Sequence, residues 1–135
     1  MAGTIDSITY DLIKGAVDAS AARGQVISNN ISNVNTPKFK VSSVKFEENL
    51  ASALSGDSIS MKLTNRKHIP DESNSLNGYT VVKDEKTSLR PDGNNVDIEK
   101  EMVDLASNNM YYNFLVSRLN GKISSKRHVI SEGRK

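Results

Sequence analysis

Apolar side chains recur every three or four residues in the first third of the chain, which is the spacing of one helix face. Starting from Ile5, these steps reach Ile8, Leu12, Gly15, Ala19, Ala22, Val26, Asn29 and Asn33. Such a heptad-like seam predicts a long amphipathic helix over about residues 4–34. The small residues at its centre allow a partner helix to approach closely, and Pro37 ends the helix because proline cannot continue it.

The same spacing returns near the other end of the chain. From Met102 it reaches Leu105, Asn109, Tyr112, Val116, Leu119, Ile123, Lys126 and Ile130. This pattern predicts a second helix over about residues 96–130, which would be roughly 50 Å long at 1.5 Å per residue. Asn94 or Asn95 is expected to cap its start.

The middle of the chain, residues 38–95, follows neither pattern for long. Short alternations of apolar and polar residues at 39–41, 44–46, 59–63 and 79–82 predict strands, and residues 47–54 predict a short helix. Residues 65–77 are polar and rich in serine and asparagine, which predicts a mobile loop.

The expected fold is therefore mainly α. Two long terminal amphipathic helices pair as a coiled coil or helical bundle, and the short middle is irregular, partly β and partly disordered. We divide the chain into an N-terminal helix with its Asn-Thr-Pro run (1–37), the middle region (38–95), and a C-terminal helix with a basic tail (96–135).

Composition limits the function further. Only 36% of the 135 residues are hydrophobic and there is no tryptophan, so the chain lacks the means to bury a large core and its helix faces need partners. The net charge of +2 indicates no general binding of polyanions, and the absence of cysteine excludes disulfides and thiolate metal sites. We expect no membrane insertion and no cleaved signal peptide, because no long apolar run occurs.

Candidate chemistry is sparse. His68 and His128 have no second ligand at helical or strand spacing, so a zinc site is not expected. Residues 92–97 resemble a calcium loop in passing but lack its alternating ligands and closing glutamate. The basic residues of 122–135 have no aromatic stacking residue beside them, which favours a solvated helix end over a nucleic-acid site.

Acidic residues gather at the start of the second helix, at Asp97, Glu99, Glu101 and Asp104. Paired carboxylates can perform acid–base catalysis, but at the first turns of a helix they are explained by the positive end of its dipole. We therefore expect no enzyme, no cofactor, no metal and no nucleic-acid partner.

Four asparagines, Asn29, Asn30, Asn33 and Asn35, crowd the end of the first helix. Asparagine disfavours helix interiors because its short amide competes for backbone groups. Asn35 alone is explained by capping in a left-handed conformation. For the group we favour burial at a helix interface, where paired amide hydrogen bonds fix register and partner choice.

The run SNNISNVNTPKFK, residues 28–40, closely resembles the N-terminal signature of bacterial flagellar rod and hook proteins, where a helix ends in a run like NNIAN-x-NTPGYK. Lys38 replaces the usual small or polar residue and Phe39 the usual tyrosine. The run DGNNVDIEKEM, residues 92–102, resembles the C-terminal region of the proximal rod subunit type, as do the residues that follow it: Ala106, Asn109, Tyr112 and Gly121-Lys122-Ile123. Together the two matches occupy roughly residues 5–41 and 90–125.

This resemblance implies a structural subunit of the proximal rod of the flagellar basal body. The terminal helices would assemble into the inner layer of the hollow drive shaft, which transmits torque and passes export substrates. The implied partners are other flagellar rod subunits, the adaptor protein between rod and MS ring, and the flagellar type III export apparatus. In isolation the exposed seams are expected to form homo-oligomers. Another flagellar axial protein, or a cytoplasmic coiled-coil adaptor or export chaperone, are the alternatives.

The residues expected at subunit interfaces are the seam positions and the asparagine run. They are Ile5, Ile8, Leu12, Ala19, Val26, Asn29, Asn30, Asn33, Asn35, Pro37, Met102, Leu105, Asn109, Tyr112, Val116, Leu119 and Ile123.

Overall fold

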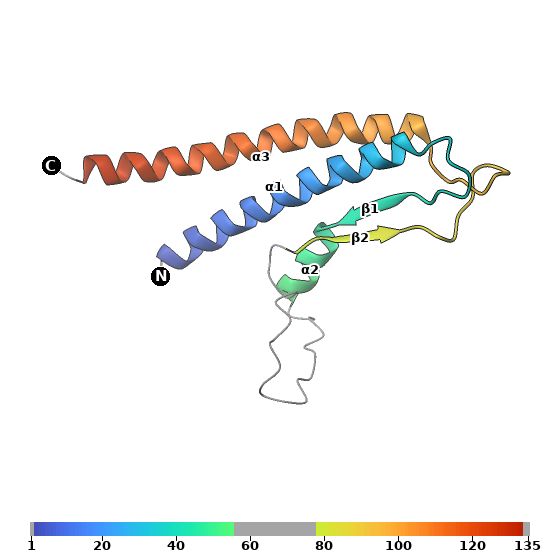
Figure 1. Ribbon diagram of the computed structural model, residues 1–135. Helices are drawn as coiled ribbons and strands as arrows, with labels where there is room; N and C mark the ends of the chain where they lie inside the picture. Colours follow the sequence, from blue (N-terminus) through green and yellow to red (C-terminus); the bar gives the residue numbers. More distant parts are fainter. Residues whose placement is uncertain (1, 56–77, 134–135) are drawn as a thin grey trace, which may run out of the picture.

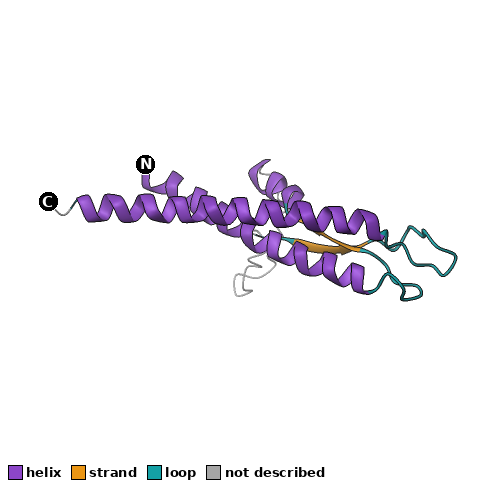
Figure 2. Ribbon diagram, turned by 90° about the horizontal axis from the view of Figure 1, so that it is seen from above, coloured by secondary structure: helices purple, strands orange, loops and turns teal. Residues whose placement is uncertain are grey.

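The computed structural model describes residues 2–55 and 78–133. Two long helices, α1 (Ala2–Ser32) and α3 (Ile98–Glu132), lie side by side and antiparallel, so that the N- and C-termini share one end of the molecule (Figure 1; Figure 2). The middle of the chain contributes β1 (Ser42–Lys45), α2 (Glu47–Ser55) and β2 (Thr80–Lys83). The mainly α fold with paired terminal helices is confirmed.

β1 and β2 form a two-stranded antiparallel sheet, in which Ser42 pairs with Lys83 and Lys45 with Thr80. In the view of Figure 1, α1 lies between α3 and this sheet. The short helix predicted over 47–54 and the strand predicted over 79–82 are confirmed within a residue or two. The strand expected at 59–63 and the loop expected at 65–77 lie outside the described residues.

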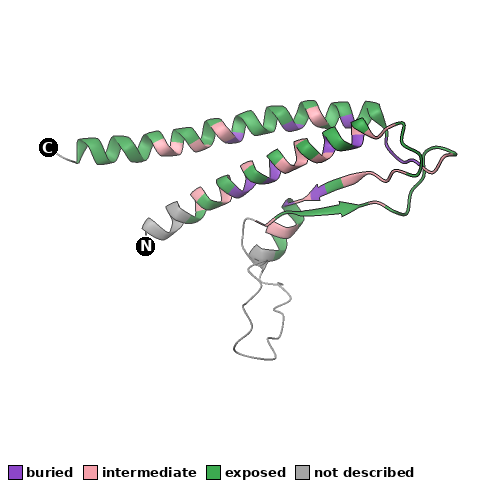
Figure 3. Ribbon diagram, in the orientation of Figure 1, coloured by how far each residue is buried: buried purple, intermediate pink, exposed green. Residues whose placement is uncertain are grey.

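The hydrophobic core is small and centred on α1. Ala16 and Ala19 of α1, Leu115 of α3 and Phe46, between β1 and α2, form it, and Val17 and Leu50 pack against it. Small side chains on α1 let α3 approach closely, as the sequence indicated, and they also make room for the Phe46 ring. Figure 3 shows the buried positions concentrated along α1, with far fewer on α3.

A buried polar pair sets the register of the two helices. The Ser20 hydroxyl donates to Asn108 Oδ1 at 3.0 Å, and Asn108 Nδ2 donates to the Ser20 carbonyl at 3.0 Å. A Cβ on Gly24 would lie 3.3 Å from Asn108 Nδ2, so glycine makes room for the amide. Because both groups are buried, any slip of one helix along the other would leave them without partners.

The cap of α3 differs from the expectation. Asp97, not Asn94 or Asn95, is the N-cap, and its carboxylate accepts hydrogen bonds from the backbone N–H groups of Glu99 and Lys100. The two asparagines are unavailable because their side chains bind other parts of the backbone, as described below.

An ion pair ties α2 to α1. Arg23 Nη2 lies 2.8 and 2.7 Å from the two carboxylate oxygens of Glu47. Burial raises the pKa of Glu47, but the hydrogen bond from Arg23 and its charge lower it, and the net shift is downward from 4.5. Both side chains are partly exposed, at 27% for Arg23 and 60% for Glu47, so the pair contributes less than about 1 kcal/mol.

We expect Arg23→Gln to destabilise the protein slightly at pH 7 and to lose this effect in acid, once the pH is below the folded-state pKa of Glu47. The folded-state pKa of Glu47 lies below its unfolded value, so the pair stabilises the fold above that value and its contribution is lost as pH falls through the folded-state pKa. Denaturant unfolding of both proteins across this range measures the difference. A deficit that persists unchanged at low pH would contradict the assignment.

Candidate functional site

The two sequence motifs meet at one end of the molecule, where the chain leaves α1 and enters α3 (Figure 1). Two asparagines from each motif make the contacts there: Asn30 and Asn33 from the first, Asn94 and Asn95 from the second. We call these four residues the asparagine junction.

Asn94 holds the turn that follows α1. Its side chain is fully buried, and Nδ2 donates to the carbonyl oxygens of Asn33, Val34 and Thr36 at 3.1, 3.0 and 2.9 Å. Its Oδ1 accepts from the Val96 backbone N–H at 2.7 Å. These three carbonyls belong to the turn at residues 33–36, directly after the last residue of α1, Ser32. A side chain about 60 residues away along the sequence supplies their donor.

Asn30 joins three elements. The residue is 1% exposed. Asn30 Oδ1 accepts from the Ser42 backbone N–H at 3.1 Å and Nδ2 donates to the Ser42 carbonyl at 2.8 Å, so the side-chain amide pairs with β1 as the backbone of a neighbouring strand would. The same Nδ2 donates to Glu101 Oε2 at 3.0 Å. Glu101 is only 7% exposed, so this bond provides a donor to a carboxylate that α3 holds out of water.

Asn95 fixes the ends of the two strands. Its Oδ1 accepts from Val41 N at 2.7 Å, and its Nδ2 donates to Asp84 O and Thr87 Oγ1 at 3.0 and 2.8 Å. The Thr87 hydroxyl and the Lys86 backbone N–H in turn donate to the Asp84 carboxylate, which lowers the pKa of Asp84.

Asn33 acts locally, and Asn35 is not the left-handed residue. Asn33 Nδ2 donates to the Asn29 carbonyl, one turn earlier in α1, at 2.8 Å. Among the described residues other than glycine, the one with positive φ is Lys38, at 59°, and its N–H donates to Asp92 O. Gly93 lies against it, since a Cβ there would be 3.7 Å from Lys38 Cα. The Thr-Pro-Lys turn and the Asp-Gly turn therefore pack directly on each other.

Lys38→Gly is expected to raise the free energy of unfolding by about 0.5–1 kcal/mol. A side chain in the left-handed region costs about 1–2 kcal/mol, and the extra entropy of glycine in the unfolded chain cancels part of the gain. Lys38→Ala is the control: it removes the charge and the long side chain but keeps Cβ, so it brings no such gain. Equal effects of the two substitutions in thermal or denaturant unfolding would count against backbone strain.

An apolar surface runs along the side of α3 that faces away from α1. Met102, Val103, Met110 and Phe114 are 60, 64, 68 and 57% exposed, and Ala106 lies exposed among them. Met110 is two residues from the inward-facing Asn108, which is roughly 200° around the helix. We call Met102, Val103, Ala106, Met110 and Phe114 the outer stripe. Exposed apolar patches of this kind mark interaction surfaces.

The structure divides the residues that were expected at subunit interfaces. Within the single chain the following are buried or partly buried: Leu12, Ala19, Val26, Asn30, Asn33, Leu105, Val116, Leu119 and Ile123. The following are exposed: Ile8, Asn29, Asn35, Pro37, Met102, Asn109 and Tyr112. The side chain of Ile5 lies outside the described set. Contact of any of them with another subunit stays a prediction.

Several important residues were missed. The buried positions of α3 are Glu101, Asn108 and Leu115, one residue before the expected Met102, Asn109 and Val116. Steps of three and four residues that start from Glu101 also reach Leu105, Tyr112, Leu115 and Leu119. The spacing of apolar residues alone is therefore compatible with two different helix faces, one through Glu101 and one through Met102. Glu101 does lie in the first turn of α3, but the helix dipole is only part of its role, because its side chain is also buried and bonded to Asn30. The donors Asn94 and Asn95 were taken only as caps.

Neither α1 nor α3, nor any other helix among the described residues, has the length and apolar content that crossing a bilayer requires.

Comparison with known proteins gives a consistent result. Residues 14–40 match the family described as "Flagella basal body rod protein". The chain is 36% identical to the flagellar basal body rod protein FlgB of Bacillus subtilis (strain 168) over 93% of its own length and 95% of that protein. Identity is 36% to FlgB of Borrelia hermsii, covering 84% and 88% of the two chains, and 26% to FlgB of Escherichia coli (strain K12), covering 87% and 89%.

Proposed function

The chain belongs to the family of the flagellar basal body rod protein FlgB, and from this membership we infer that it is a structural subunit of the basal body rod. Its role is to assemble with other components of the rod. The described side chains form a scaffold of buried amides and helix contacts, and we propose no catalytic role for it.

We further propose that the subunit lies at the cell-proximal end of the rod. The support is the run at residues 92–102, which resembles the proximal subunit type, and the similarity to FlgB proteins over most of the chain. Its neighbours would then include the adaptor protein between rod and MS ring. We also propose that it reaches this position through the flagellar type III export apparatus.

The outer stripe is the observation that carries the assembly role. It is apolar, continuous over about three turns of α3, and uncovered in the single chain. Burying an exposed methionine or phenylalanine against a neighbour contributes about 1.5–3 kcal/mol each. A subunit with such a surface is stabilised by packing it against the helices of adjacent subunits.

The asparagine junction is suited to a subunit that transmits mechanical force. The hydrogen bonds of Asn30, Asn94 and Asn95 connect α1, α3 and both strands at one end, and the Ser20–Asn108 pair fixes the register of the helices further along. Buried polar networks with every group bonded are rigid because each bond is costly to break without water. We propose that this rigidity allows the subunit to transmit torque along the rod.

Met110→Lys tests the function. The side chain is exposed, so we expect the free energy of unfolding to stay within about 0.5 kcal/mol of the wild type. A charge placed in a buried apolar contact is strongly unfavourable, and we expect the amount of the protein in purified basal bodies to fall at least about tenfold, with loss of motility. Met110→Leu, which keeps the site apolar, is the matched control and is expected to incorporate normally.

Quantitative mass spectrometry of basal bodies from the source organism measures both variants against the wild type. Absence of the wild-type chain from basal bodies of motile cells would overturn the proposed function and favour a soluble adaptor or chaperone. Normal incorporation of Met110→Lys would leave the rod function standing and remove the outer stripe from the assembly surface.

A further inference from the structure

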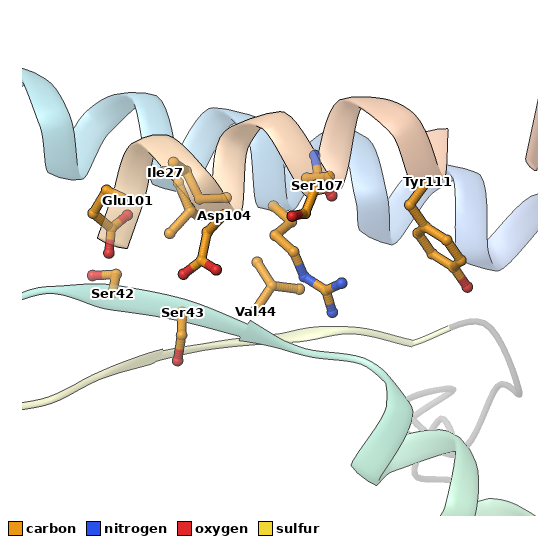
Figure 4. Close-up of a pocket in the computed structure, with 11 residues that line it drawn as sticks. Ile27, Ser42, Ser43, Val44, Glu101, Asp104, Ser107 and Tyr111 are labelled. Carbon is orange, nitrogen blue, oxygen red and sulfur yellow. The ribbon is translucent and has the colours of Figure 1, made fainter. Parts of the chain in front are cut away.

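A trough of about 440 Å³ opens between α1, β1 and the first turns of α3 (Figure 4). Val26 and Ile27 of α1 and Val44 of β1 give it an apolar lining. Glu101 and Asp104 of α3 also line it, and their carboxylates point toward β1 in Figure 4. The trough lies on a different flank of α3 from the outer stripe, because Asp104 and Met110 are six residues and therefore roughly 240° apart around the helix.

The trough carries an excess of negative charge. Its cation, Arg23, is neutralised by the two-oxygen contact with Glu47. Asp104 is exposed and has no ion-pair partner among the residues that the structure describes, and Glu101 accepts a hydrogen bond only from the neutral amide of Asn30 there. Among the described residues, no cation therefore lies within ion-pair distance of these two carboxylates above the apolar surface.

This combination specifies the chemistry of an occupant. Lysine and arginine carry a charge on a long apolar stem, so the stem can cover Val26, Ile27 and Val44 while the charge meets Asp104 and Glu101. An anion, including nucleic acid, would be repelled by the two carboxylates. The volume is enough for a few side chains, which is what one turn of a helix presents.

The basic end of this chain's own α3 is a poor candidate for the occupant. Lys126 lies 5.2 Å from the Tyr10 ring centroid, and both Lys122 and Lys126 have interaction partners within the chain. These two lysines are thus engaged within the chain, and we look for the occupant in a different protein of the same assembly.

We propose that the trough receives a helix segment of a different rod subunit, one that carries a lysine or arginine beside apolar side chains, with its cation on Asp104 and Glu101. The proposal rests on the proposed function, and it identifies a second assembly surface, polar and charge-selective, beside the apolar outer stripe.

Two serines of α3 allow a matched crosslinking experiment. Ser107 lines the trough, whereas Ser117 is exposed and lies away from it, and both belong to the same helix. The photo-crosslinking amino acid p-benzoylphenylalanine is placed at Ser107 or at Ser117 in the full chain, basal bodies are purified and illuminated, and the products are mapped by mass spectrometry. We expect Ser107 to crosslink to a lysine- or arginine-bearing segment of another rod subunit, and Ser117 not to reach that segment.

The charge requirement is tested in the same basal bodies. Asp104→Lys places a cation where one is expected to bind, and because Asp104 is exposed the fold should tolerate it. We expect the Ser107 crosslink to fall at least fivefold with Asp104→Lys and less with Asp104→Asn. Glu101 is left unchanged because it supports Asn30.

The outcomes separate the two proposals. If the chain is missing from basal bodies, the proposed function fails. If the chain is present but Ser107 crosslinks to a second copy, to its own chain, to a segment without a basic residue or to nothing, the trough inference fails and the rod function stands. An Asp104→Lys variant with an unchanged crosslink also overturns the inference.

Discussion

Asn94→Ala is expected to lower the free energy of unfolding by about 3 kcal/mol, because a buried donor that serves several acceptors is lost and those acceptors become unsatisfied. The two hydrogens of Asn94 Nδ2 are shared among the carbonyls of Asn33, Val34 and Thr36, and alanine can bond none of them. The Val96 N–H loses its acceptor as well. Arg90 Nη1 still donates to Val34 O at 3.1 Å, so the loss is not larger.

Chemical denaturation followed by circular dichroism measures this change. The matched control is the same substitution at Asn29, an exposed residue of α1, which should be neutral or slightly stabilising because alanine favours the helix. If the free energy of unfolding of Asn94→Ala stays within about 0.5 kcal/mol of the wild type, the turn after α1 does not depend on Asn94.

Asn30→Ala is expected to have the second large effect, lowering the free energy of unfolding by about 2–4 kcal/mol, since a buried carboxylate that loses its hydrogen-bond donor is costly. The substitution removes two bonds to the Ser42 backbone and the bond to Glu101. Asn33→Ala is the comparison: Asn33 bonds mainly the preceding turn of its own helix, so about 1 kcal/mol or less is expected there.

A double-mutant cycle isolates the contribution of Glu101. Glu101→Gln removes the charge that Asn30→Ala leaves without a donor, so the double variant should be more stable than the sum of the two single effects predicts, by at least about 0.5 kcal/mol. Strict additivity would mean that Asn30 acts through β1 alone.

The sequence was sufficient to predict the two paired terminal helices, but it was insufficient to predict the contacts of the asparagine junction. Long runs of apolar residues at helical spacing identified both terminal helices, and alternation identified β2. The strand predicted at 39–41 is absent, and the strand predicted at 44–46 overlaps β1, which begins earlier, at Ser42. The spacing could not choose between the phases through Glu101 and Met102, because a pattern of small, aromatic and polar residues is compatible with both. The choice depends on a tertiary fact, that Asn30 and Ser20 provide hydrogen-bond partners for Glu101 and Asn108.

The asparagines show a similar limit. Their abundance indicated a role beyond a frayed helix end, and Asn30 is indeed buried in a network. But the residue that holds the turn after α1 is Asn94, and nothing local to the first motif indicates an amide donor from the second. The left-handed residue was placed at Asn35 by its general tolerance of that conformation, whereas the chain uses Lys38, where packing against Gly93 fixes the turn.

The spacing of the asparagine junction along the chain has a consequence for folding. The bonds from Asn94 to the turn after α1 span 58 to 61 residues, and the bond from Asn30 to Glu101 spans 71. None of them can form until residue 94 of the 135 is present, and closing loops of that length is an entropic barrier to be crossed before any stabilisation is gained. A chain that emerges N-terminus first therefore has α1 followed by an unbonded turn, and an uncovered small-residue face, for most of its synthesis. The fold is therefore completed late, when these hydrogen bonds form nearly together. A chain truncated before residue 94 cannot form them.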